Sequence, residues 1–173
     1  PAKTQSSLLE CMEERQVTID GIRHPVGEFF TAFATQNPVE YEGTYPLPEA
    51  QLDRFLLKLT IPLPSRQDEI DVLTRHAEGF NPRDLHAAGV RPVAGPADLE
   101  AARAAVAKTT VSPEITAYVV DICRATRESP SLTLGVSPRG ATALLATARA
   151  WAWLTGRDYV IPDDVKALAL PAL

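Results

Sequence analysis

A stiff proline-containing segment, Pro62-Leu63-Pro64, separates two stretches of the chain that differ in hydrophobic periodicity. Before this segment, short apolar runs alternate with turn signals, an order that is typical of an α/β layer. After it, the apolar spacing is helical, and proline repeatedly stands at the first position of a helix, where its missing N–H costs little. We therefore predict a partial α/β domain over residues 1–64, followed by an all-α helical bundle over residues 65–173.

The first stretch begins with an amphipathic helix pattern over residues 4–15. Alternating polar and apolar residues around Asp20-Gly21 then predict a β-hairpin over residues 16–26, because Asp-Gly is a strong two-residue turn. The continuous apolar runs at 29–34 and 55–61 are typical of strands buried on both faces of a parallel sheet, with a short helical turn before the second run.

The second stretch begins with Ser65, which is expected to cap a helix together with Asp68 three residues later. A loop with several proline and glycine residues is expected over residues 79–95. Gly156 is expected to end the longest helix in a left-handed conformation. Further helices are predicted to begin at Gly95-Pro96, Ser112-Pro113, Ser137-Pro138 and Pro162. The residues predicted to face inward are Ile70, Leu73, Ala77, Ile115, Val119, Ile122, Leu144, Leu145, Ala148 and Trp151.

The composition of the 173-residue chain predicts a globular protein, since 45% of its residues are hydrophobic. Its net charge of -5 has the wrong sign for a surface that binds chiefly to phosphate backbones, so nucleic acid is not the expected partner. No apolar run has the length of a membrane span, and we expect a cytoplasmic location. The chain starts with Pro-Ala-Lys rather than Met, and we expect it to be part of a longer protein.

The sequence contains no complete catalytic or metal-binding motif. Cys11 and Cys123 are predicted to be buried free thiols, and the histidines have no spacing that is typical of metal ligands. Neither a phosphate-binding loop nor an apolar strand ending in Asp-Glu occurs, and Asp68-Glu69 is interpreted as the acidic start of a helix. We therefore predict no metal site within this chain.

Three polar residues are candidates for binding a phosphate or a water. Asn37 follows a predicted buried strand, at the edge of a sheet where ligands of α/β proteins bind, although an Asn-Pro turn is an equally simple interpretation. Arg54 directly precedes the second apolar run, where its planar guanidinium could bind phosphate or pair with Asp53 or a neighbouring glutamate. Arg139 lies in the first turn of a predicted helix, where a cation is unfavourable unless an anion binds there; the alternative is a solvent-extended side chain.

The chain resembles the MoxR family of AAA+ ATPases over nearly its whole length. The most specific match is the string from Glu42 to Phe55, Glu-Gly-Thr-Tyr-Pro-Leu-Pro-Glu-Ala-Gln-Leu-Asp-Arg-Phe. The other matching segments are Lys3-Thr4-Gln5, Leu8-Leu9-Glu10, the run from Met12 to Thr18, the run from Ala34 to Pro38, and Ser137-Pro138-Arg139. The resemblance implies that residues 1–64 are the C-terminal half of an AAA+ core with a hairpin insertion and that residues 65–173 are its helical lid.

The resemblance also implies roles for the three candidate residues. Asn37 would be sensor 1, which orients the attacking water, and Arg139 would be sensor 2 on the lid. Arg54 would be the arginine finger, which acts on a nucleotide held by the adjacent subunit. The implied reaction is hydrolysis of ATP with Mg²⁺, whose main binding residues would lie upstream of this chain, so we expect the isolated chain to be inactive.

The family resemblance implies a hexameric ring and chaperone-like maturation of client proteins, including von Willebrand A-domain proteins. Two other functions remain open at this point. The first is a non-enzymatic protein-docking module that uses the hairpin and the helices. The second is a helicase-like DNA motor, which the acidic composition disfavours.

Overall fold

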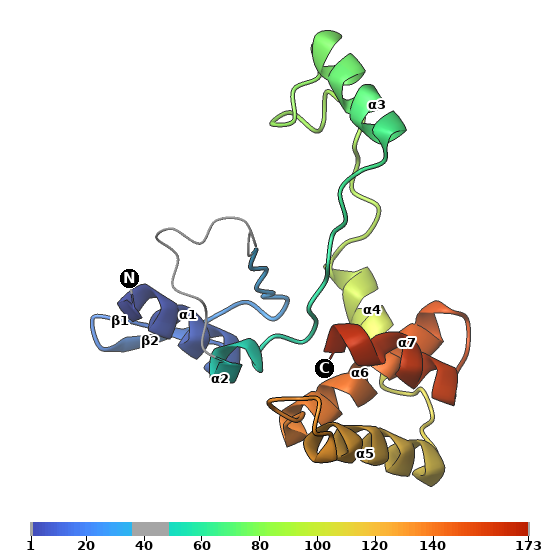
Figure 1. The fold of residues 1–173 in the computed structure, drawn as a ribbon. Helices are drawn as coiled ribbons and strands as arrows, with labels where there is room; N and C mark the ends of the chain where they lie inside the picture. Colours follow the sequence, from blue (N-terminus) through green and yellow to red (C-terminus); the bar gives the residue numbers. More distant parts are fainter. Residues whose placement is uncertain (1, 36–48, 173) are drawn as a thin grey trace. The chain divides into compact units, whose positions relative to one another are not determined.

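The computed structural model describes residues 2–35 and 49–172, and over these residues it contains helices and one small sheet (Figure 1). The chain divides into two compact units, one formed by Pro1–Lys58 with Lys108–Leu173 and the other by Leu59–Ala107. The elements are α1 (Ala2–Glu14), β1 (Gln16–Ile19), β2 (Ile22–Pro25), α2 (Glu49–Leu52), α3 (Arg66–Ala77), α4 (Pro96–Val106), α5 (Pro113–Glu128), α6 (Pro138–Leu154) and α7 (Pro162–Ala172). In the part of the chain that is described, no helix is long and apolar enough to cross a membrane.

The predicted β-hairpin is confirmed. β1 and β2 pair antiparallel, with Gln16 opposite Pro25 and Ile19 opposite Ile22. Both turn residues, Asp20 and Gly21, have positive φ angles, 51° and 79°, as a tight two-residue hairpin turn requires. The hairpin lies beside α1 (Figure 1). The Thr18 hydroxyl of β1 donates a 2.9 Å hydrogen bond to the carboxylate of Glu10 in α1.

The two predicted parallel strands are wrong, because residues 29–34 and 55–61 have no regular secondary structure. Phe33 is 92% exposed and Ile61 is 90% exposed, whereas a strand inside a sheet would bury both. A strand forms only where a neighbouring strand supplies ladder hydrogen bonds, and no described segment pairs with either run. The α/β layer is therefore represented, in the described residues, by the helices and the hairpin alone.

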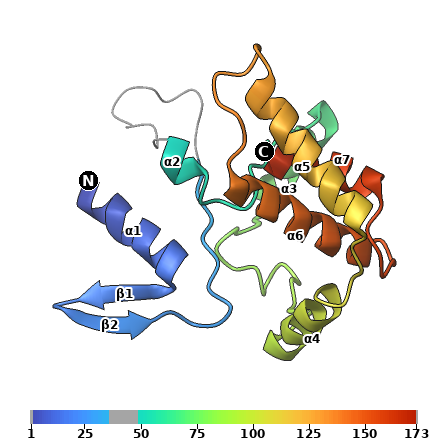
Figure 2. The ribbon, with the colours of Figure 1, turned by 90° about the horizontal axis from the view of Figure 1, so that it is seen from below.

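The apolar core is formed by the three helices at the C-terminal end of the chain. Figure 2 shows α5 lying across α6, and α7 packs against both. α5 and α6 begin where predicted; Ser112 and Ser137 cap them, each followed by proline at the first helical position. Gly156 follows α6 with a φ angle of +82°, which confirms the predicted left-handed end. The buried apolar side chains of this core are Ile115, Val119, Cys123, Leu144, Ala148, Ala152, Val160 and Val165.

The predicted inner faces are confirmed only where a partner helix exists. Ile115, Val119, Leu144 and Ala148 are buried as predicted, and Ile122 and Leu145 are half-buried against the core. Trp151 is instead exposed at the end of α6. In the unit Leu59–Ala107, neither α3 nor α4 has a buried residue. The inward orientation that was predicted for α3 is therefore wrong within this unit, because nothing in the unit covers that face.

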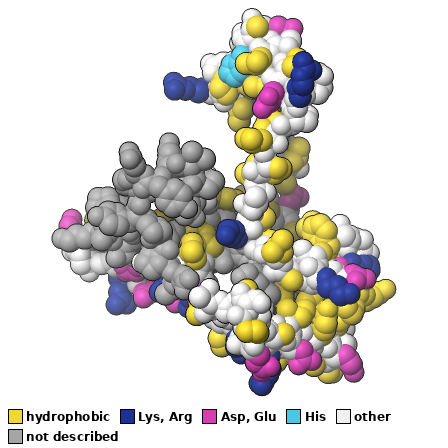
Figure 3. Space-filling view, viewed as in Figure 1, with side chains coloured by type: hydrophobic (Ala, Val, Ile, Leu, Met, Phe, Trp, Pro, Cys, Tyr) yellow, Lys and Arg dark blue, Asp and Glu magenta, His cyan; other side chains and the backbone are white. Residues whose placement is uncertain are grey.

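Local signals nevertheless place α3 and α4 where the sequence predicted them. Ser65 and Asp68 form the expected capping box, in which the Ser65 Oγ accepts from the Asp68 amide at 3.2 Å and Asp68 accepts from the Ser65 amide at 3.1 Å. The Ser65 hydroxyl also donates to Oδ2 of Asp68 at 2.6 Å, and this bond, together with the one from the Ser65 amide, lowers the pKa of Asp68. On the face drawn in Figure 3, acidic, basic and hydrophobic side chains are interspersed over the part of the chain that contains α3. The boundary between residues 64 and 65 stays a prediction.

Candidate functional site

Glu13, near the end of α1, binds two arginines from distant parts of the chain. One carboxylate oxygen, Oε2, forms an ion pair with Nη1 of Arg54, and the other, Oε1, accepts a 2.9 Å hydrogen bond from Nη2 of Arg139. The remaining terminal nitrogen of Arg139, Nη1, lies 3.8 Å from Oδ2 of Asp53. These four residues, Glu13, Asp53, Arg54 and Arg139, are called the arginine cluster below.

Arg54 reaches the cluster from the end of α2. Its backbone amide donates to the carbonyl of Gln51 at 3.3 Å, so that the chain continues to turn after the helix ends. The Arg54 side chain is half-buried, and its Nε is buried without a hydrogen-bond partner among the described residues. Buried donors of this kind are rare in folded proteins, and here the unsatisfied donor belongs to a residue that the sequence singled out.

Arg139 reaches the cluster from the first turn of α6. The Ser137 hydroxyl accepts a hydrogen bond from the Gly140 amide at 3.1 Å, which caps the helix, and donates one to Oδ1 of Asp53 at 2.7 Å. A cation at a helix N-terminus is unfavourable by itself, because the amide groups there carry partial positive charge. The carboxylates of Glu13 and Asp53 supply the negative charge that offsets it.

The loop before α6 is attached to the end of α5 by hydrogen bonds. These bonds determine the position of the first turn of α6, which contains Arg139. Arg127 donates from Nε to the carbonyl of Val136 at 2.6 Å, and the amide of Val136 donates to the hydroxyl of Thr126 at 3.0 Å. Gly135 passes so close to α5 that an added Cβ would lie 2.4 Å from Cα of Arg127. Only glycine permits this approach, so position 135 determines the path of the chain into α6.

The electrostatic balance of the cluster suits exchange of an anion rather than permanent stabilisation. The exposed fractions of its side chains are 29% for Arg54, 35% for Asp53, 42% for Glu13 and 49% for Arg139. Water therefore screens these pairs, and each contributes about 0.2–1 kcal/mol at most. Two forked guanidinium groups beside a helix N-terminus can bind phosphate oxygens when a carboxylate gives way.

The structure thus brings two of the three predicted site residues together, and Asn37 lies outside the described residues. An ion pair was considered for Arg54 with Asp53 or a neighbouring glutamate; the pair exists, but its partner is Glu13, a glutamate far away in the sequence. Sequence reasoning missed Glu13 because its helical position left it with the solvent-facing glutamates of the amphipathic pattern. The Ser137 contact with Asp53 was missed as well, since no spacing rule connects residues so far apart. No group of three or more potential metal ligands occurs among residues 2–35 and 49–172.

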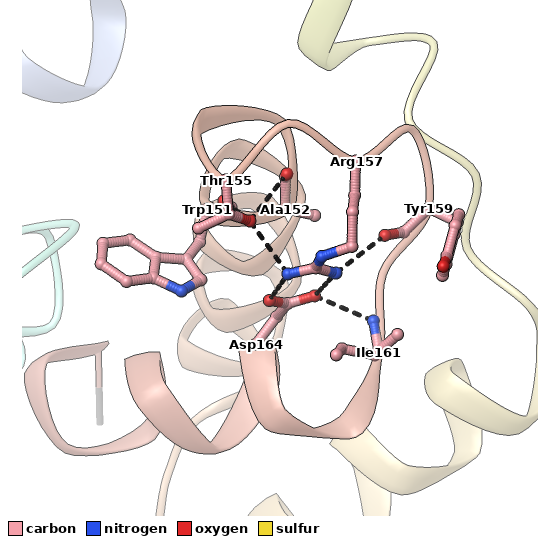
Figure 4. Close-up of polar contacts among 7 residues, drawn as sticks. All are labelled: Trp151, Ala152, Thr155, Arg157, Tyr159, Ile161 and Asp164. Atoms are coloured by element: carbon pink, nitrogen blue, oxygen red, sulfur yellow. Dashed lines mark hydrogen bonds and ion pairs between the residues drawn. The ribbon is translucent and has the colours of Figure 1, made fainter.

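A second cluster of polar contacts lies in the α6–α7 connection and is structural. Figure 4 shows the guanidinium of Arg157 against the carboxylate of Asp164, with Nη1 donating to Oδ2 at 2.7 Å and Nη2 paired with Oδ1. The same guanidinium donates to the Thr155 hydroxyl at 2.9 Å and to the Tyr159 carbonyl at 3.2 Å. Asp164 is 2% exposed and also accepts from the Ile161 amide at 2.9 Å. The hydrogen bonds from Arg157 lower the pKa of Asp164 and raise that of Arg157 itself.

The two cysteines are free and buried, as the sequence predicted. Burial raises the pKa of the Cys123 thiol, against the opposing effect of nearby Arg127. A thiol with a raised pKa is less often ionised and therefore a poorer nucleophile. Cys123 belongs to the apolar core and takes no part in the candidate site.

Comparison with known proteins matches both ends of the chain to one family. The family model described as "ATPase family associated with various cellular activities (AAA)" matches residues 1–57, and the model described as "AAA lid domain" matches residues 124–173. The arginine cluster lies within these two matched segments, because Glu13, Asp53 and Arg54 belong to the first and Arg139 to the second.

Individual relatives agree with the family models. The uncharacterised protein YeaC of Bacillus subtilis is 49% identical over 167 residues, which cover 96% of this chain and 51% of YeaC. The chaperone MoxR1 of Mycobacterium tuberculosis is 40% identical over 174 residues, which cover 95% of this chain and 44% of MoxR1. A solved structure of a candidate ATPase from Cytophaga hutchinsonii is 39% identical, with a TM-score of 0.88, and the match covers 100% of this chain and 54% of that one.

The chain spans about half the length of the curated relatives it matches. The matched segments of these relatives nevertheless cover nearly all of this chain. The two family models, the proteins named MoxR and the structural match agree on one assignment. The chain belongs to the MoxR family of AAA+ ATPases.

Proposed function

We propose that this chain is part of a protein that couples ATP hydrolysis to chaperone-like remodelling of other proteins. Arg54 serves as the arginine finger and Arg139 as the sensor 2 residue. The observation that carries the proposal is the meeting of these two guanidinium groups at one carboxylate, although they come from the end of α2 and the start of α6. The MoxR relatives, one of which is named a chaperone, support the same function.

The chemistry of phosphoryl transfer explains why two arginines are needed. Negative charge spreads over the phosphoryl oxygens in the transition state, and fixed cations that meet those oxygens lower the barrier. Arg139 adds its charge to the partial positive charge of the α6 N-terminus, so both attract a phosphate to the same place. Arg54 presents a planar fork that can bind two oxygens of the transferred group. Asn37, as sensor 1, would orient the attacking water.

The remaining parts of the site belong to the longer protein. Mg²⁺ supplies charge neutralisation on the phosphate oxygens when it is bound, and its main ligands, like the phosphate-binding loop, would lie in the part of the relatives that precedes this segment. Because an arginine finger acts on a neighbouring subunit, the proposal includes a hexameric ring. Client proteins, with von Willebrand A-domain proteins among them, are proposed on the family resemblance alone. The cytoplasmic location likewise stays a prediction.

The Arg54→Ala substitution in the full-length protein tests the role of the finger. ATP binding should persist, since the finger does not hold the nucleotide of its own subunit, whereas turnover should fall by about 10³–10⁵-fold. The measurements are a nucleotide-binding titration and a steady-state phosphate-release assay. Unchanged turnover would reduce Arg54 to a surface ion pair with Glu13.

A mixing experiment then tests action between subunits. Arg54→Ala subunits are combined with subunits whose upstream phosphate-binding loop is disabled, and neither preparation turns over ATP by itself. In a mixed ring, one interface can combine an intact loop with an intact Arg54, so partial activity should return. Activity that stays absent on mixing, while rings still form, would contradict action in trans.

The isolated 173-residue chain should not hydrolyse ATP, because its sequence has neither a phosphate-binding loop nor an apolar strand that ends in Asp-Glu. The test is a phosphate-release assay on the purified chain after removal of contaminating ATPases. Turnover that follows the chain through every purification step would contradict this prediction.

A protein-docking module remains the second candidate, and one observation favours it. Ile19 and Ile22 stand opposite each other at the end of the hairpin and are 57% and 63% exposed. Exposed apolar residues at a hairpin tip can contact a partner protein. The two functions separate in the Arg54→Ala experiment, because a docking module without ATPase activity loses nothing when Arg54 is removed.

A further inference from the structure

The role of Glu13 is not explained by the proposed catalytic residues. Both of its carboxylate oxygens are in use, one on Nη1 of Arg54 and one on Nη2 of Arg139, so a single side chain engages one terminal nitrogen of each arginine. Among the described residues, Glu13 is the one whose ion pairs include both Arg54 and Arg139. Glu13 therefore stands where a phosphate group would have to bind if the two arginines were to serve a nucleotide.

The charges of the cluster indicate that Glu13 and a phosphate group cannot both pair with the two arginines at once. Arg54 and Arg139 contribute two positive charges, and Glu13 and Asp53 contribute two negative charges, so the cluster is neutral as it stands. A phosphate that approached this arrangement would meet the repulsion of a carboxylate and find Nη1 of Arg54 and Nη2 of Arg139 already paired with it. When Glu13 withdraws, the balance becomes positive and the Nη atoms become available to phosphate oxygens.

The exposure of the cluster allows that withdrawal. All four side chains are between 29% and 49% exposed, so water can replace either partner of each pair. Screening by solvent keeps such pairs weak, and a polyphosphate carries more charge than a carboxylate. Glu13 also has no other hydrogen-bond partner among the contacts of the described residues, so its release breaks nothing else.

We propose that Glu13 is a positioning residue that holds Arg54 and Arg139 in place until nucleotide phosphate displaces it. The inference rests on the proposed ATPase function and adds a step to it, in which the arginines exchange an internal carboxylate for a phosphate. Before the exchange, the two side chains are ordered near the site, which reduces the conformational freedom that they lose when a phosphate arrives. The energetic consequence is competition, since Glu13 opposes nucleotide binding to Arg139.

The test uses Glu13→Gln in the full-length protein, with Glu14→Gln as the matched control. Both substitutions remove one negative charge at the end of α1, but Glu14 accepts a hydrogen bond from Gln16 and forms no ion pair with an arginine of the described residues. The probe is a slowly hydrolysed ATP analogue, and its dissociation constant is measured by calorimetric titration. Glu13→Gln should tighten binding by about two- to fivefold, which corresponds to the loss of a weak competing ion pair, and Glu14→Gln should leave it unchanged.

Kinetics and a second substitution distinguish positioning from a structural role. Removal of a competitor acts before the chemical step, so the KM for ATP should fall by the same factor while kcat stays constant. In the Arg139→Ala background, Glu13→Gln should no longer change the affinity, because the interaction that it removes is already absent. A purely structural role would weaken binding or leave it unchanged in both backgrounds.

The outcomes separate the inference from the function on which it rests. Affinity for the analogue that is unchanged or weaker in Glu13→Gln, or equally tighter in Glu14→Gln or in the Arg139→Ala background, overturns the inference while wild-type turnover upholds the ATPase. A wild-type full-length protein that neither binds the analogue nor hydrolyses ATP overturns the proposed function and the inference together.

Discussion

The C-terminal helices α5–α7 and the unit Leu59–Ala107 are both helical, but only the former have a core. Leu144, Ala148 and Val165 are completely buried between α5, α6 and α7. In α3 and α4, by contrast, no residue is buried, and Leu73 of α3 is 70% exposed. Both regions have helix-capping signals of the same kind, so capping does not account for the difference.

The comparison teaches that capping places a helix and packing stabilises it. A capping box satisfies amide groups at the first turn, which fixes where α3 begins. Short isolated helices are nevertheless marginal in water, because their hydrogen bonds alone barely offset the cost of ordering the chain. We therefore expect substitutions in α5–α7 to change global stability, and substitutions in α3 to have local effects only.

The largest effect is expected from Leu144→Ala. Leu144 is fully buried in α6, and its truncation should lower the free energy of unfolding by about 2–5 kcal/mol, through lost apolar contacts and the cavity left behind. The measurement is urea unfolding followed by tryptophan fluorescence, since both tryptophans of the chain, Trp151 and Trp153, lie in α6.

Leu73→Ala is the matched control for this comparison. It removes the same atoms from an exposed position of α3. The free energy of unfolding that the tryptophans of α6 report should therefore change by about 0.5 kcal/mol or less. Equal effects of the two substitutions would mean that α3 has a packed environment comparable with that of α6, and the comparison would be broken.

An intermediate effect is expected from Asp164→Asn. The substitution leaves the guanidinium of Arg157 without its charged partner, and should cost about 2–3 kcal/mol at neutral pH. This is below the usual range for a broken buried ion pair, because Arg157 is 25% exposed and can be partly solvated. Urea unfolding of α6 is again the measurement, and Asp163→Asn is the control, since Asp163 is exposed.

The pH dependence of this substitution follows from the lowered pKa of Asp164. A carboxyl group whose pKa is lower in the folded state stabilises the fold above its unfolded value of about 3.9, and loses that contribution as the pH falls through the folded value. The difference in stability between the wild type and Asp164→Asn should therefore be constant near pH 7 and shrink below about pH 4. A difference that is independent of pH would contradict the ion-pair explanation.

The smallest effect is expected from Ser65→Ala, which removes one side-chain cap from α3. Amide hydrogens in the first turns of α3 should exchange about fivefold faster, as expected for a lost N-terminal cap, while those of α5–α7 should be unchanged. Hydrogen exchange followed by mass spectrometry distinguishes the two regions. Faster exchange in α6 would show that the two units are energetically coupled.

Local features of the molecule were predictable from the sequence, because each depends on residues that are close together. Asp20-Gly21 can adopt the positive φ angles of a tight turn, and Gly156 can end a helix, whatever the rest of the chain does. The Ser65 capping box follows the same logic, since its two side chains are three residues apart. The predicted hairpin and helix starts were therefore confirmed at these places.

Features that need a distant partner were predicted less well. The apolar runs at 29–34 and 55–61 have strand-like composition, but a strand also needs a neighbour, and composition does not supply one. The same holds for Leu73, whose helical spacing indicated a buried face that nothing in its unit covers. In the candidate site, Arg54 and Arg139 were recognised by position and by resemblance, whereas Glu13 became visible only through its contacts.

The close passage of Gly135 over α5 has a consequence for how Arg139 can move. The loop before α6 is tied to α5 by the hydrogen bonds of Arg127 and Thr126 to Val136, and Gly135 lies directly against the helix backbone. These contacts restrict the backbone of the loop, so we do not expect Arg139 to shift as part of a flexible segment. We therefore expect the Arg139 backbone to move together with α5 and α6, while its side chain can still change rotamer. Because α5, α6 and α7 share one core, the position of the Arg139 backbone depends on the packing of all three helices.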